Sequence, residues 1–147
     1  GSEALGAMAR RGPGLALLVF LACVRSGFGC SFLLANFPLR NLSRVDETLR
    51  PRGPDATRHV RVAGVDLVHN LLHITGERLE QPLLEPGAAA AALLNGEVYN
   101  WRSLPGGATA RSDGDVILPT FLRYGPRFVR HLYGEFALAV LHFDDGD

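Results

Sequence analysis

Hydrophobic residues occur in short runs along the chain, separated by glycine, proline and polar residues. Residues 31–37 and 136–143 are apolar runs of strand length, and such runs bounded by turn residues indicate buried strands. Residues 60–68 alternate imperfectly between apolar and polar positions, and residues 71–75 form a shorter apolar segment. The pattern predicts a strand in each of these four segments.

A helical spacing is found in the C-terminal third of the chain. Over residues 113–124 the apolar positions fall on one face of a helix, with Ser112 as a candidate N-cap. Pro119 interrupts this segment, so we expect the helix to start late or to kink. Residues 128–132 extend the helical region. Strands interleaved with one or two helices predict an α+β domain.

Two further segments carry turn residues. The alanines of residues 88–94 favour a helix, but the flanking Pro86-Gly87 and Asn95-Gly96 favour a short buried strand. Asn-Gly is also a strong signal for a hairpin turn. Residues 52–55, Arg-Gly-Pro-Asp, predict another turn, because proline fixes its own φ and glycine permits an unusual one.

Composition is that of an ordinary globular domain. The protein has 147 residues, of which 47% are hydrophobic and 20% charged, and its formal net charge is zero. No basic stripe indicates a nucleic-acid partner. The two cysteines, Cys23 and Cys30, fit neither a disulfide framework nor a zinc site with paired ligands. We therefore expect one domain, with no metal site and no nucleic-acid partner.

The first 29 residues have the pattern of a secretory signal peptide. Residues 8–11 are short and basic, residues 15–24 are an apolar run of ten, and Gly27-Phe28-Gly29 precedes Cys30. The run is shorter than the roughly 20 apolar residues of a transmembrane helix, so no stable membrane span is expected. Residues 1–29 are predicted to be a leader or targeting segment. A buried N-terminal strand or helix is the alternative.

Residues 30–147 would then form the domain. The sequence stops at Asp144-Asp145-Gly146-Asp147 directly after an apolar run, where a turn is expected. We therefore expect a domain that is incomplete at its C-terminus and is a fragment of a longer protein.

A series of ordered motifs resembles class II glutamine amidotransferases, specifically the asparagine synthetase family. The resemblance covers residues 30–143; Arg-Gly-Pro-Asp alone is weakly specific, whereas Asn-Gly-Glu-Val-Tyr-Asn is fairly specific. The motifs are Cys30, Arg52-Gly53-Pro54-Asp55, His69, Gln81-Pro82-Leu83, Leu94-Asn95-Gly96-Glu97-Val98-Tyr99-Asn100, Ser112-Asp113-Gly114-Asp115-Val116-Ile117-Leu118 and Leu132-Tyr133-Gly134-Glu135-Phe136-Ala137-Leu138-Ala139.

The resemblance implies the N-terminal nucleophile (Ntn) fold, an αββα sandwich of two antiparallel sheets. It also implies that Cys30 is the nucleophile and that its own α-amine takes the thiol proton. A terminal amine has a pKa of about 7.7–8.0 and a thiol about 8.5, so this transfer is nearly balanced. An amide nitrogen could not accept the proton, so residues 1–29 must first be removed. The alternative is a small buried hydrophobic cysteine.

Four other residues match family positions. Asn95 and Gly96 match the oxyanion hole, where each donor contributes roughly 3–4 kcal/mol in the transition state. They also fit an ordinary hairpin turn, and the two interpretations can hold together. Glu97 and Asp113 match residues around the α-amino group of glutamine, which two carboxylates suit. Their alternative is a solvated turn acid and a helix N-terminal acid.

The sequence departs from the family where an arginine usually grips the substrate α-carboxylate. That position falls on Leu71 in His69-Asn70-Leu71-Leu72-His73-Ile74. The segment Leu72-His73-Ile74-x-Gly76, followed by Gln81-Pro82, resembles the divergent asparagine synthetase domain-containing branch. A charge-assisted hydrogen bond contributes about 1.5–3 kcal/mol, so affinity for glutamine is expected to fall unless another group substitutes. Arg58, Arg61 and Arg78 are near in sequence. Ser31 also stands where glycine usually follows the nucleophile.

The resemblance thus implies a glutaminase that hydrolyses glutamine to glutamate and ammonia for an asparagine-synthetase-type ligase reaction in amino-acid biosynthesis. A degenerate, inactive domain with a structural or interaction role is the alternative, and a stand-alone hydrolase acting on another amide is a third hypothesis. Glutamine and a synthetase domain of the parent protein are the expected partners. No cofactor is expected here, because ATP and Mg²⁺ belong to the synthetase domain. The leader suggests the secretory pathway or an organelle, whereas the family suggests the cytoplasm.

Overall fold

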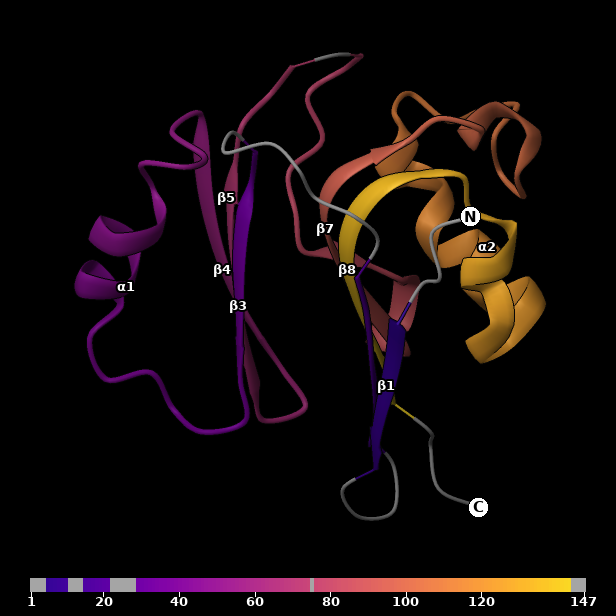
Figure 1. The fold of residues 1–147 in the computed structure, drawn as a ribbon. Helices are drawn as coiled ribbons and strands as arrows, with labels where there is room; N and C mark the ends of the chain where they lie inside the picture. Colours follow the sequence, from indigo (N-terminus) through magenta and orange to yellow (C-terminus); the bar gives the residue numbers. More distant parts are fainter. Residues whose placement is uncertain (1–4, 11–14, 22–28, 75, 144–147) are drawn as a thin grey trace.

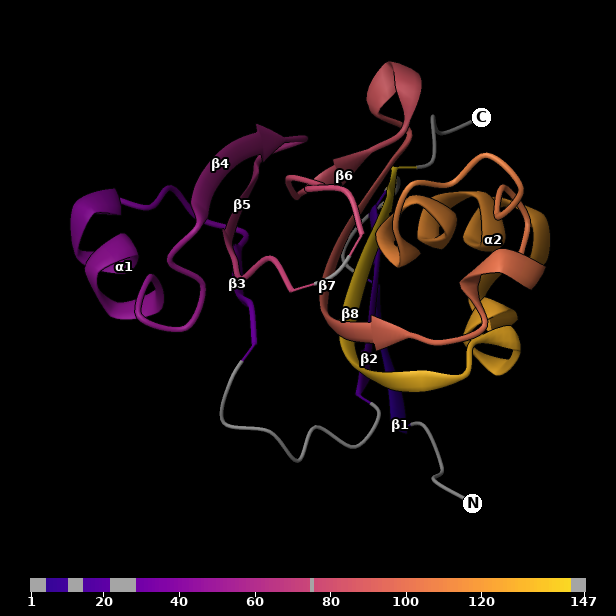
Figure 2. The ribbon, with the colours of Figure 1, turned by 90° about the horizontal axis from the view of Figure 1, so that it is seen from above.

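Two antiparallel sheets lie face to face between two helical layers in the computed structural model (Figure 1). The structure describes residues 5–10, 15–21, 29–74 and 76–143. Helix α1 (Leu42–Leu49) covers the outer face of the smaller sheet, and helix α2 (Ile117–Tyr124) covers the outer face of the larger sheet (Figure 2). This layout confirms the predicted α+β class and the αββα sandwich of the Ntn fold.

The smaller sheet has the strand order β3-β5-β4 and is antiparallel throughout. One predicted strand, residues 60–68, is wrong, because a turn at Ala63 and Gly64 divides it. Both residues have positive φ, 46° and 80°, as a tight hairpin requires. The predicted strand at residues 71–75 is also wrong, because β5 ends at Leu71 and residues 72–74 lie outside any strand. The three strands are β3 (Ser31–Ala35), β4 (Ala56–Val62) and β5 (Val65–Leu71).

The larger sheet has the order β1-β2-β8-β7-β6. Its strands β7 and β8 pair over nine positions, from Ala90 with His142 to Val98 with Gly134. The alanine run is therefore a strand rather than a helix. The strands are β1 (Leu5–Arg10), β2 (Leu15–Leu21), β6 (Leu83–Leu84), β7 (Ala90–Val98) and β8 (Gly134–Phe143).

Strands β7 and β8 build two cores from alternate residues. Ala91 and Leu93 face the smaller sheet and pack with Leu67 of β5. Ala92 and Leu94 face the helical layer and pack with residues of α2. Because successive side chains of a strand point to opposite faces, a strand buried on both faces has an unbroken apolar run. This explains why neither segment alternates in the sequence.

The predicted leader contributes strands β1 and β2. Strand β2 pairs with β8, from Leu15 opposite Phe143 to Leu21 opposite Ala137. Part of the apolar run thus lies in a strand, as the alternative interpretation had it. The pairing does not test whether residues 1–29 are removed, so the leader stays a prediction. Gly27, Phe28 and Cys23 lie outside the described residues, as does the C-terminal turn at residues 144–147.

The helical region begins with a 3₁₀ turn, η3 (Asp113–Val116), and α2 follows it directly. Pro119 lies in the first turn of α2, where a proline is tolerated, so the predicted late start is confirmed. Ser112 is at the N-cap position, but its side chain makes no capping hydrogen bond. The region continues as η4 (Gly125–His131), and shorter 3₁₀ turns are η1 (Pro86–Ala88) and η2 (Trp101–Ser103). Among the described residues, every helix is too short or too polar to span a bilayer.

Candidate active site

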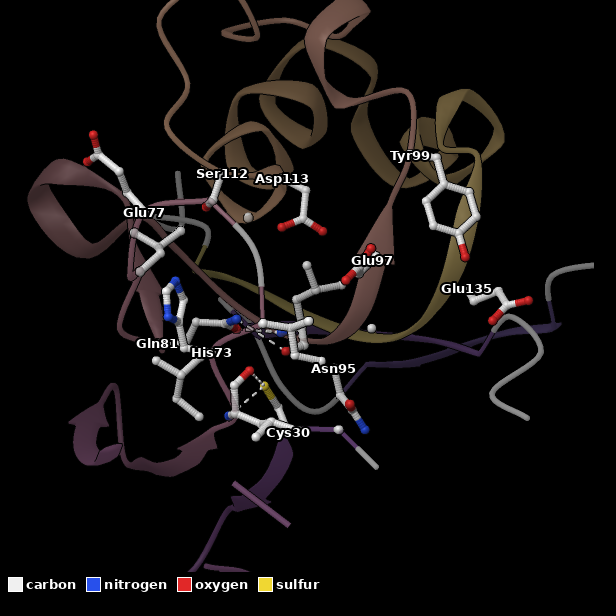
Figure 3. Close-up of a pocket in the computed structure, with 18 residues that line it drawn as sticks. Cys30, His73, Glu77, Gln81, Asn95, Glu97, Tyr99, Ser112, Asp113 and Glu135 are labelled. Atoms are coloured by element: carbon white, nitrogen blue, oxygen red, sulfur yellow. Dashed lines mark hydrogen bonds between the residues drawn. The ribbon is translucent and has the colours of Figure 1, made fainter. Parts of the chain in front are cut away.

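A cavity of about 330 Å³ opens where the end of β5 faces the end of β7. Figure 3 shows side chains from both sheets and from the segment before α2 around it, with Cys30 and Asn95 at one end and Asp113 at the other. All five residues that the sequence suggested as site residues line this cavity: Cys30, Asn95, Gly96, Glu97 and Asp113. The fold therefore gathers residues from three separate segments of the protein.

Cys30 immediately precedes β3 and is half-buried. Its Sγ accepts a hydrogen bond from the Leu72 N–H at 3.3 Å and lies 3.6 Å from the Leu72 carbonyl oxygen. Burial raises the pKa of the Cys30 thiol, and the charges of Asp113 and Asp55 act in the same direction. The thiol is therefore mostly protonated near neutral pH, and a nucleophilic role requires a base that takes its proton.

The residue before Cys30 occupies part of the same cavity. Gly29 lines it, and a Cβ added to Gly29 would lie 2.8 Å from Oδ1 of Asn95. While Gly29 precedes Cys30, the nitrogen of Cys30 is a peptide amide, which has no basic lone pair. While Gly29 is attached, Cys30 therefore has no basic α-amine, and the Gly29 backbone lies close to the Asn95 side chain.

Asn95 and Gly96 lie inside β7, where they pair with Ala137 and Phe136 of β8. The hairpin-turn interpretation of this Asn-Gly pair is therefore wrong. Gly96 has a φ of 123°, and a Cβ there would overlap the carbonyl oxygen of Glu135. Only glycine fits this backbone conformation and this approach to the neighbouring strand.

Two side chains to which the sequence assigned no role hold the residue before Asn95. The Gln81 amide accepts from the Leu94 N–H at 2.6 Å and donates to the Leu94 carbonyl at 3.2 Å. Nε2 of His69 lies 3.1 Å from the same carbonyl. Burial lowers the pKa of His69 to about 4, so the ring is neutral at pH 7 and fits a positioning role. Both residues lie in motifs that resemble the family, His69 and Gln81-Pro82-Leu83, and these motifs were the sequence signal that could have identified them.

The opposite end of the cavity is acidic. Oδ2 of Asp113 accepts from the Val98 N–H at 2.8 Å. Burial raises the pKa of Asp113, and the nearby charge of Glu97 raises it further. Glu77 and Glu135 also line the cavity, whereas no arginine is among its described lining residues. An ammonium group bound there would pair with Asp113 and Glu97 and favour their ionised forms.

The position where the family carries an arginine is apolar in this structure. Leu71, the last residue of β5, is buried and lines the cavity. The three nearby arginines bind elsewhere: Arg58 donates to the Pro82 carbonyl at 3.2 Å, Arg61 pairs with Asp66, and Arg78 donates to the Asp55 carbonyl at 2.7 Å. None of them replaces the missing arginine in the described cavity.

The groups around the cavity suit acyl transfer more than metal binding. Within residues 5–10, 15–21, 29–74 and 76–143, no group of three or more His, Cys, Asp or Glu side chains is arranged to hold a metal ion. The arrangement instead contains a thiol, an amide side chain, a strained glycine and two neighbouring carboxylates. These groups suit acyl transfer from an amide that carries an amine.

Comparison with known proteins gives a family and several relatives. A family model for a glutamine amidotransferase domain matches residues 28–146. A probable glutamine-hydrolysing asparagine synthetase of Dictyostelium discoideum is 36% identical over 101 residues, which are 63% of this chain and 18% of that protein. Asparagine synthetase 2 of Oryza sativa is 31% identical over 121 residues, 76% of this chain and 20% of that protein.

A third relative has a different name. Amidase chyE of Penicillium rubens is 30% identical over 97 residues, which are 60% of this chain and 14% of that protein. The matched region thus spans between 14% and 20% of the length of these relatives.

Proposed function

The chain belongs to the glutamine amidotransferase domain family and is related to the asparagine synthetases, and from this premise we propose that it hydrolyses a glutamine side-chain amide through Cys30. The observation that carries the proposal is the convergence of Cys30, Asn95, Gly96, Glu97 and Asp113 on one cavity. Family membership alone would leave the activity open. The shared cavity adds a place where the reacting groups meet.

The reaction begins once Cys30 is the first residue of the protein. Removal of residues 1–29 creates an α-amine at Cys30 and takes Gly29 away from Asn95. The amine accepts the thiol proton, and the thiolate attacks the carbonyl carbon of the glutamine amide. A terminal amine and a thiol have pKa values within about one unit. The raised pKa of the buried thiol makes this internal base necessary.

The tetrahedral intermediate carries a negative oxygen beside β7. The Asn95 side-chain amide and the Gly96 backbone N–H are the donors that we assign to it. The C–N bond then breaks, the α-ammonium returns its proton to the leaving nitrogen, and ammonia departs. Water hydrolyses the remaining thioester to give glutamate and free Cys30. Each lost donor is expected to cost about 3–4 kcal/mol of transition-state stabilisation.

Asp113 and Glu97 bind the α-ammonium of the substrate in this proposal. Asp113 is fixed by its bond from the Val98 N–H, so its carboxylate is held at the end of the cavity opposite Cys30 (Figure 3). We further propose that the ammonia serves an asparagine-synthetase-type reaction in a synthetase domain of the parent protein. That domain, rather than this one, would bind ATP and Mg²⁺.

Ammonia release from glutamine tests the proposal. The full-length gene product with Cys30 as its first residue is compared with its Cys30→Ala variant, and circular dichroism establishes that both are folded. We expect release that disappears in the variant. A folded protein with a free N-terminal cysteine that releases no ammonia would overturn the proposal and favour an inactive domain with a structural or interaction role.

A further inference from the structure

We propose that this cavity prefers a glutamine residue whose amine is free and whose α-carboxylate is blocked, as at the N-terminus of a peptide, over free glutamine. The inference rests on the proposed function and specifies its substrate class. The reaction is the same amide hydrolysis: the bond between the amide carbon and its nitrogen breaks, water supplies the hydroxyl, and ammonia and a glutamyl peptide form.

The charged residues of the cavity are the first observation that supports this preference. Glu77, Glu97, Asp113 and Glu135 line it, and no arginine is among its described lining residues. Lysine is absent from the sequence and the Cys30 α-amine serves as the base of the proposed reaction, so an arginine or a protonated histidine would have to balance a carboxylate. His73 is the histidine that lines the cavity, and its Nε2 lies 3.0 Å from the Gly76 carbonyl. The substrate ammonium thus finds several partners, and the substrate carboxylate finds none of comparable strength.

The wall beside Cys30 supports the same conclusion. Leu71, Leu72 and Ile74 line it, and all three are apolar residues. Moving a carboxylate out of water without a partner costs far more free energy than moving a neutral peptide group. The α-carboxylate of free glutamine is therefore unfavourable beside this apolar wall, whereas a neutral peptide bond at the same place is not.

A second hollow continues from the acidic end of the cavity. Its volume is about 590 Å³, and five residues line both spaces, among them Glu97, Tyr99 and Asp113. The second hollow also contains Trp101, Arg102 and Arg111. The Arg102 guanidinium lies 4.7 Å from the centre of the Trp101 ring, and Arg111 pairs with Asp115. Since the acids that hold the amine lie at the junction, a peptide that continues from the same α-carbon can enter this hollow. The residue after glutamine would then contact Trp101 and Arg102.

Substrate comparison tests this inference. The full-length protein that starts at Cys30 is given L-glutamine, glutaminyl-glycine or glycyl-glutamine, and mass spectrometry measures the glutamate-containing product. The Cys30→Ala variant corrects for spontaneous cyclisation of the dipeptide. We expect kcat/KM for glutaminyl-glycine to exceed that for glutamine at least about tenfold. Glycyl-glutamine, which lacks the amine at the acidic end, should react more slowly than glutaminyl-glycine by a similar factor.

Each other outcome has a distinct meaning. Equal or faster hydrolysis of free glutamine overturns the inference and leaves the proposed function intact. Hydrolysis of none of the three substrates overturns both. Equal hydrolysis of the two dipeptides overturns the role given to the substrate amine.

The Arg102→Ala variant tests whether Arg102 contacts the residue after glutamine or binds the α-carboxylate of free glutamine. Arg102→Ala should raise KM for glutaminyl-glycine several-fold and leave KM for glutamine unchanged. Arg44→Ala, on α1 at the far side of the smaller sheet, is the matched control and should change neither. If Arg102→Ala instead weakens free glutamine, Arg102 holds the α-carboxylate and the inference is overturned.

Discussion

The two walls of the cavity differ in how tightly the backbone is specified. The β7 wall, residues 95–97, is paired with β8, and the Leu94 carbonyl that precedes it is held by His69 and Gln81. The β5 wall, residues 71–73, follows the end of a strand and holds Cys30 through Leu72. Asn95, Gly96 and Glu97 lie on the first wall, and Leu71 and the backbone that holds Cys30 lie on the second.

Such a site can change more easily at one wall than at the other. A substitution in the β7 wall must satisfy a strained backbone and a paired strand, so few residues fit. A substitution in the β5 wall alters a side chain that faces the cavity, as Leu71 does. The backbone around Asn95 and Gly96 is therefore more tightly constrained than the side chain at position 71.

Gly96→Ala is expected to have the largest effect. A Cβ there would overlap the Glu135 carbonyl, and φ is 123°, so β7 and β8 must separate. We expect a loss of at least about 3 kcal/mol in the free energy of unfolding, measured by urea denaturation. The control is Gly87→Ala, which also has positive φ but open space around its Cβ. A Gly96→Ala protein no less stable than the control would show that the β7 wall tolerates change.

Asn95→Ala should act on catalysis rather than on folding. Loss of one oxyanion donor lowers kcat by about 10²–10³-fold, with KM and melting temperature nearly unchanged. The control is Asn41→Ala, which removes the N-cap of α1, lowers stability by about 1 kcal/mol and should leave kcat alone. Unchanged kcat in Asn95→Ala would exclude it from the oxyanion hole.

His69 should make stability depend on pH. Its pKa is about 4 in the folded protein and 6.5 is its ordinary value, so the unfolded state binds the proton more tightly. The His69 contribution is complete above about pH 6.5 and is lost as the pH falls towards 4, by about 3 kcal/mol at most. His69→Gln should flatten the stability curve in this window, and His131→Gln, at an exposed position, should not. Parallel curves for His69→Gln and the unchanged protein would contradict this account.

Leu71→Arg should have the smallest effect. Unlike the other variants, it should improve a property of the protein, the binding of free glutamine. A guanidinium at this position could pair with the α-carboxylate of free glutamine, which contributes about 1.5–3 kcal/mol. We expect KM for glutamine to fall roughly tenfold or more and the preference for glutaminyl-glycine to shrink. Leu71→Met keeps the volume without the charge and should change neither value. A folded Leu71→Arg protein with unchanged KM would show that the β5 wall does not face the carboxylate.

The sequence predicted the layers of the fold better than its strand ends. The apolar runs at residues 31–37 and 136–143 lie where β3 and β8 are found, because buried strands need apolar residues on both faces. The single strand predicted at residues 60–68 failed at Ala63, whose φ of 46° no local preference of alanine indicates. The Asn-Gly turn failed because pairing with β8 outweighed the local turn preference of Asn95 and Gly96.

The site was predicted through the resemblance rather than through spacing. Cys30, Asn95 and Asp113 are far apart in sequence, and only the pairing of strands and the packing of sheets bring them to one cavity. The motif at residues 81–83 marked Gln81, but its contact with Leu94 could not be foreseen, since that contact depends on a side chain that meets β7 across the fold. The second hollow likewise depends on the packing of η2 and η3 beside β7.

The most direct test of the central claim is the dependence of ammonia release on a free Cys30 amine. Initial rates are measured with glutamine and with glutaminyl-glycine, for the protein that starts at Cys30 and for the same protein retaining residues 1–29, each shown to be folded. The account predicts rapid release from the first protein and a loss of at least about 10²-fold in the second, which lacks the general base. Equal rates from the two proteins would contradict it.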